Sequence, residues 1–95
     1  MIVWDVSRRQ LCQDCFVTHH RHAHELTLQA ADTGLLLMYA EAGQILNECT
    51  RVTDDWVRRV FTRSKVWPTG EEYTKQLELV AELTLRNLRT SRGLQ

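Results

Sequence analysis

The chain has 95 residues, which favours one small domain, and its formal net charge at pH 7 is zero. One proline and four glycines are too few breakers for a sandwich or a barrel, and they favour an all-helical protein. The neutral net charge excludes a general cationic attraction to nucleic acid, so any binding of that kind would depend on local clusters.

No apolar run reaches the roughly eighteen residues of a membrane span, and no secretory signal opens the chain. The three cysteines are an odd number, which favours reduced thiols over a disulfide framework. We therefore expect a protein of the cytoplasm, or of the host cell cytoplasm if it is viral, with no membrane partner and no cofactor.

The first predicted helix covers residues 8–30 and follows an N-terminal arm at residues 1–6, which is either extended or a strand fragment. Ser7 and Gln10 have the spacing of a capping box. Val6 and Leu11 have the spacing of the hydrophobic staple that accompanies such a box. Together these two signals predict that the helix begins at Arg8.

The second predicted helix is the longest and covers residues 33–66. Its apolar residues recur at steps of three and four, in one phase, for about seven turns. Gly43 costs about 1 kcal/mol relative to alanine, but the phase does not shift across it, so we expect one continuous helix. The apolar stripe consists of Leu35, Met38, Ala42, Ile45, Cys49, Val52, Trp56 and Val60.

The third predicted helix covers residues 70–91. Pro68 ends the helix before it, and Thr69 and Glu72 form a second capping box. We expect residues 1–95 to form a single all-helical domain, a long helical hairpin plus a third helix. A central helix of roughly 50 Å is poorly covered by two partners, and Leu36 and Leu37 leave extra apolar surface. Both features predict a homodimer with a four-helix core.

Four residues near the N-terminus have a spacing that zinc ligands can take, Cys-x2-Cys-x4-His-x3-His. Against a metal site, the capping box at Ser7 places both cysteines inside a helix, where ligands strung along one face cannot close on one ion. The cysteines would then be small core residues and the histidines a polar edge of the helix interface. We expect no metal, and the candidates are Cys12, Cys15, His20 and His24.

A basic row lies on the helix face opposite the apolar stripe. Three of its members are spaced seven residues apart, within about 40° of one another around the helix axis. A solvated helix face would show the same pattern, and Asp54 and Asp55 could neutralise part of it. A dimer would double the row into a flat strip that suits the phosphates and 2′-hydroxyls of double-stranded RNA. The row consists of Asn47, Arg51, Arg58 and Lys65, with Arg59 and Arg63 at its edge.

In this layout the chain resembles the small RNA-silencing suppressors of insect nodaviruses, which are all-helical antiparallel dimers that lie along one face of double-stranded RNA. The resemblance covers mainly residues 33–66, and it implies that Asn47, Arg51, Arg58 and Lys65 would meet RNA. The residues that carry it, in their alternation of apolar core and basic row, are Leu46, Asn47, Cys49, Arg51, Val52, Trp56, Arg58 and Val60.

The chain has no glycine-rich phosphate loop, no Gly-x-Ser-x-Gly and no His-Glu-x-x-His, so we do not expect an enzyme. The leading hypothesis is a homodimer that binds double-stranded RNA without sequence preference, as a viral suppressor of RNA silencing. Its predicted RNA-binding residues are Asn47, Arg51, Arg58, Arg59 and Lys65. Two alternatives stay open: a protein-interaction module that docks a partner through Leu36, Leu37 and the N-terminal arm, and a small zinc-stabilised helical domain.

Overall fold

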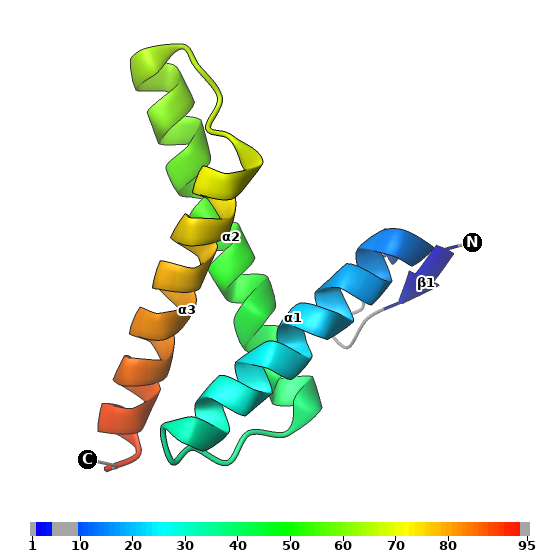
Figure 1. Ribbon diagram of the computed structural model, residues 1–95, viewed down its shortest axis with the longest axis vertical. Coiled ribbons are helices and arrows are strands. Elements are labelled where there is room, and N and C mark those ends of the chain that lie inside the picture. Colours follow the sequence, from blue (N-terminus) through cyan, green and yellow to red (C-terminus); the bar gives the residue numbers. More distant parts are fainter. Residues whose placement is uncertain (1, 5–9, 94–95) are drawn as a thin grey trace.

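The part of the chain that the structure describes forms three helices, as the sequence predicts, and two short strands (Figure 1). The computed structural model describes residues 2–4 and 10–93, and it describes side chains from Phe16 to Gly93. Helix α1 spans Gln13–Asp32, α2 spans Tyr39–Ser64 and α3 spans Gly70–Ser91. The strands in this part of the chain are β1 at Ile2–Trp4 and β2 at Gln10–Cys12.

The start of the first helix was predicted wrongly. Residues 10–12 belong to β2, which pairs with β1 in antiparallel register, Ile2 opposite Cys12 and Trp4 opposite Gln10. The helix therefore begins at Gln13 and not at Arg8. Isoleucine, valine and tryptophan favour strands, and the ladder that β1 offers competes with helix formation at residues 10–12. The proposed cap, Ser7, lies outside the described residues.

The start of the central helix was also predicted wrongly, because α2 begins at Tyr39 and not at Thr33. Gly34 closes α1 in the left-handed region, with φ at 83°. The Leu35 amide then donates to the Ala30 carbonyl at 2.8 Å and the Gly34 amide to the Ala31 carbonyl at 3.1 Å. This pair of bonds is a Schellman motif, and it buries Leu35 against the end of α1. After this closure the chain runs through four further residues, 35–38, before α2 begins.

The rest of α2 and all of α3 agree well with the sequence. The helix α2 runs through Gly43 without interruption, as predicted. It ends at Ser64, two residues earlier than predicted, because Lys65 adopts the left-handed conformation with φ at 62°. The bounds of α3 are those predicted, and the hydroxyl of Thr69 accepts from the Glu72 amide at 3.1 Å, which confirms the predicted cap.

Both α1 and α3 pack on α2, so the central helix is shared between two partners (Figure 1). Helix α3 runs antiparallel to α2 and is joined to it by polar contacts along its length. The Tyr73 hydroxyl donates to Asp54 at 2.9 Å near one end, and Arg92 binds Glu41 near the other. The buried core lies where the three helices meet, and its members are Ala23, Leu26, Ala30, Leu35, Ala42, Leu46, Cys49, Ala81 and Leu85.

The buried line of α2 is rotated from the predicted stripe. The sequence predicts Val52, Trp56 and Val60 as the inward residues of its second half, but these side chains are only partly buried. Thr53 and Val57, one position later, are the buried ones. The rotation follows from the two-sided packing, since the face between α1 and α3 is the one removed from water.

The adjacent residues Leu35 and Leu36 give a direct test of this packing. Leu35 is 1 % exposed and Leu36 is 92 % exposed. We expect Leu35→Ala to lower the free energy of unfolding by about 2–5 kcal/mol, because it leaves a cavity in the core. Leu36→Ala removes the same atoms from the surface of the single chain and, at protein concentrations where the chain is monomeric, is expected to cost less than about 0.5 kcal/mol. Urea denaturation followed by the helical circular dichroism signal measures both, and equal losses would contradict the packing.

Candidate nucleic-acid interface

The first member of the basic row, Asn47, faces α1. Its Oδ1 atom lies 2.6 Å from Nε2 of His19, and its side chain is half-buried. This contact joins α1 to α2 across their interface. Asn47 therefore contributes to the packing of the two helices and lies apart from the exposed basic side chains.

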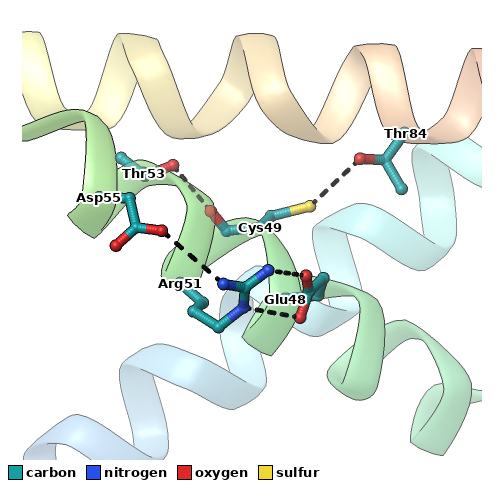
Figure 2. A network of polar contacts seen from close by, with 6 residues as sticks. All are labelled: Glu48, Cys49, Arg51, Thr53, Asp55 and Thr84. Carbon is teal, nitrogen blue, oxygen red and sulfur yellow. Dashed lines mark hydrogen bonds and ion pairs between the residues drawn. The ribbon is translucent and has the colours of Figure 1, made fainter.

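The second member, Arg51, is exposed but already engaged by carboxylates (Figure 2). Its guanidinium donates from two nitrogens to Glu48, with Nε at 3.1 Å from Oε2. On the other side, its Nη1 lies 3.7 Å from Oδ2 of Asp55. The hydrogen bond from Arg51 lowers the pKa of the Glu48 carboxyl, and Glu48 in turn raises the pKa of Arg51. Two negative charges thus face this one cation, so the group carries a net charge of −1.

The opposite side of the same turn holds α3 (Figure 2). The Cys49 thiol donates to Oγ1 of Thr84 at 3.6 Å, and the buried Thr53 hydroxyl donates to the Cys49 carbonyl at 2.8 Å. Burial raises the pKa of the Cys49 thiol, with the Thr84 contact opposing that shift. Cys49 and Thr53 are thus packing residues, while the Glu48–Arg51–Asp55 group points away from α3.

The C-terminal end of α2 carries four cations that no carboxylate of the described residues binds. Within the described residues, no carboxylate lies within ion-pair distance of Arg58, Arg59, Arg63 or Lys65, and all four side chains are exposed. The Arg59 guanidinium donates a hydrogen bond to a backbone carbonyl, that of Asp55, at 3.4 Å. We call these four residues the basic end of α2.

The shape of the basic end differs from the predicted row. Arg58, Arg59 and Arg63 border one shallow depression on the outer surface of α2, together with Thr62. Lys65 lies past the last helical residue, in the turn that leads to α3. These exposed cations therefore form a cluster at one extremity of the molecule, at the top of Figure 1, and not a row along the helix.

Two apolar residues beside this cluster were not predicted as functional. Val66 is 67 % exposed and Trp67 is 59 % exposed. The Trp67 ring stacks on Phe61, with ring centroids 4.5 Å apart and planes inclined by 17°. The sequence signal for this feature is Trp67 directly before Pro68, which keeps the backbone extended and the ring outside the helix.

The described residues do not assemble a metal site. None of them forms a group of three or more histidine, cysteine, aspartate and glutamate side chains that could hold an ion. His20 packs between Phe16 and Tyr39, with ring centroids 4.0 and 5.2 Å away, and His24 is exposed. Cys12 lies in β2, which corrects its predicted place in a helix. The side chains of Cys12 and Cys15 lie outside the description.

Comparison with known proteins adds no family to this picture. Neither a protein-family model, nor a curated protein, nor a solved structure matches the chain. In the described part of the chain, no helix combines the length and apolar character that a membrane crossing requires.

The pairing of Arg51 with Glu48 can be tested by titration. In Arg51→Ala we expect the pKa of Glu48 to rise toward its ordinary value, because the hydrogen bond that favours its charged form is lost. Arg58→Ala, two turns further along the same face of α2 and without a carboxylate partner among the described residues, should leave the pKa of Glu48 unchanged. NMR titration of the carboxyl carbon measures both variants, and an unchanged Glu48 pKa in Arg51→Ala would show that the pair does not persist in solution.

Proposed function

We propose that the protein is a homodimer that binds double-stranded RNA without sequence preference and acts as a viral suppressor of RNA silencing. The observation that carries this proposal is the basic end of α2. It holds four exposed cations within eight residues, and among the described residues no carboxylate binds them.

Cations of this kind suit the RNA backbone. Arginine guanidinium groups bind phosphate oxygens through two parallel hydrogen bonds, and each contact releases counterions from the nucleic acid. Such contacts position a protein but carry no sequence information. The deep, narrow major groove of an RNA helix also hides its base edges from side chains. A rigid basic surface would therefore bind duplexes of any sequence.

The structure narrows the set of residues that we propose for RNA contact. Arg58, Arg59 and Lys65 remain from the predicted row, and Arg63 joins them. Arg51 would have to release Glu48 and Asp55 to bind phosphate, and Asn47 is held at the α1 interface. Both are therefore weaker candidates than the basic end of α2.

A second copy of the chain would extend the basic surface. The segment between α1 and α2 alternates in exposure: Leu35 is buried, whereas Leu36 and Met38 are 92 % and 76 % exposed. Large apolar side chains that face water in this way mark interaction surfaces when they gather together. Covering them by a second copy would give the homodimer and place two basic ends on one particle.

Substitutions at the basic end of α2 should weaken RNA binding much more than substitution of Arg51. We expect Arg58→Ala with Arg59→Ala to weaken binding to a short RNA duplex at least tenfold and to flatten the plot of log affinity against log salt by about 0.9 per lost phosphate contact. Arg51→Ala, which removes a cation already paired, should change affinity less than threefold. Fluorescence anisotropy at two salt concentrations measures these effects, and absence of duplex binding at low salt would refute the proposed function.

A second candidate function is a protein-interaction module that does not bind nucleic acid. Of the two leucines predicted to dock a partner, Leu36 is exposed, whereas Leu37 is partly buried against the core. The exposed side chains of Leu36 and Met38 favour this function, because the same surface could hold a different protein. It shares with the first proposal the docking role of the segment at residues 35–38, and it differs in predicting no RNA affinity.

The docking role of that segment can be tested apart from RNA. If a second copy covers Leu36, Leu36→Asp should convert a dimer to a monomer, because it buries an unpaired charge at the interface. Leu83→Asp places the same change on the outer face of α3, where Leu83 is 45 % exposed, and should leave the dimer intact. Analytical ultracentrifugation measures both. If the wild-type protein is monomeric, the dimer no longer belongs to the proposal. The segment at residues 35–38 would then be interpreted as a docking surface for a different protein.

A further inference from the structure

The ring of Trp67 is an exposed aromatic surface with a fixed orientation. Phe61 covers one face of the ring at a centroid distance of 4.5 Å, so the 59 % of the residue that is exposed includes the opposite face. Lys65, in the left-handed conformation, turns the chain out of α2, and Pro68 restricts the Trp67 backbone to extended geometry. The ring therefore loses little conformational entropy when something stacks on it.

Cations lie close in the sequence to both members of this aromatic pair. Lys65 precedes Trp67 by two residues, and Arg58 lies one helical turn before Phe61, on which the ring stacks. Acidic residues at the start of α3 are engaged elsewhere: Glu71 pairs with Lys75 at 3.3 Å, and Glu72 meets the hydroxyl of its cap Thr69. An exposed ring face together with cations that no carboxylate binds is the combination by which proteins bind single-stranded nucleic acid, through base stacking and phosphate contact.

The interior of a duplex cannot use this ring, since both faces of every internal base pair are covered by neighbouring pairs. An unpaired nucleotide beside a duplex offers a free base face and a phosphate a short distance apart. We propose that Trp67 stacks on an unpaired RNA base at a duplex end while the basic end of α2 binds the adjoining phosphates. This inference rests on the proposed function and adds to it a preference for duplexes with single-stranded overhangs.

The neighbouring Val66 supplies a control on the same turn. Val66 is 67 % exposed, as apolar as its neighbour but without a ring face. If the turn acts only through apolar contact, as it would against the surface of a lipid bilayer, Val66→Ala and Trp67→Ala should weaken binding to similar degrees. If the turn acts through stacking, only Trp67→Ala should weaken binding to the overhang duplex, and Trp67→Phe should retain part of the affinity.

The test compares a blunt RNA duplex with the same duplex carrying single-stranded 3′ overhangs, by fluorescence anisotropy. We expect wild type, Val66→Ala and Trp67→Phe to bind the overhang duplex more tightly than the blunt one. Trp67→Ala should lose about fivefold or more in affinity for the overhang duplex and bind the blunt duplex as wild type does. The helical circular dichroism signal of each variant confirms that it folds.

Three results would overturn the inference while leaving the proposed function intact: equal wild-type affinity for both duplexes, equal losses on both in Trp67→Ala, or the same loss in Val66→Ala. Failure of the proposed function is distinct, because wild type would then bind neither duplex at low salt. Vesicles of phosphatidylcholine with phosphatidylserine form a further arm. Binding to them that depends on Val66 and Trp67 alike would assign the turn to a membrane surface and overturn the inference.

Discussion

The rest of the structure depends on one constraint, that α2 must present a single buried face to two other helices. Small residues make this possible, since Ala42, Gly43, Cys49 and Thr53 line that face and are all buried. Side chains of this size let α1 and α3 approach the same helix from two sides. Two of them also take part in polar contacts, as the Cys49 thiol reaches Thr84 and the Thr53 hydroxyl bonds back to the Cys49 carbonyl.

Because α1 and α3 bury one face of α2, the charged side chains of α2 lie on its solvent-facing side. Near the middle of the helix, the outward side chains face solvent close to one another, and Arg51 binds Glu48 and Asp55 (Figure 2). Past Asp55 the helix continues for nine residues, to Ser64, with arginines and no carboxylates. Four cations without a carboxylate partner among the described residues are therefore grouped at the end of α2, which projects to one extremity of the molecule (Figure 1).

Much of the helical framework could be predicted from the sequence, because its signals are local. The Thr69 cap and the pattern after it give the bounds of α3, and the unbroken apolar phase across Gly43 predicts a continuous α2. The errors arise where strand pairing or a helix-closing turn competes with the helical pattern. Pairing of β1 with β2 overrides the helical signal after Ser7, and the Schellman closure at Gly34 delays α2 to Tyr39.

The candidate site could likewise be predicted only in part from the sequence. Residue spacing alone placed Asn47 and Arg51 in line with Arg58, and it could not show that His19 holds Asn47 or that Glu48 and Asp55 hold Arg51. Lys65 could be assigned to the row only by assuming a helix that continues past it. The exposure of Trp67 and its stacking on Phe61 required the structure, because a tryptophan before a proline is equally compatible with a buried corner.

The central claim is that the basic end of α2 is the part of the protein that binds RNA. The most direct measurement is a titration of the isotope-labelled protein with a short RNA duplex, followed by the backbone amide signals in two-dimensional NMR spectra. We predict chemical-shift changes concentrated at residues 58–67, with much smaller changes around Glu48 and Arg51. Shift changes confined to α1 or to residues 35–38, or no changes at saturating RNA, would contradict the claim.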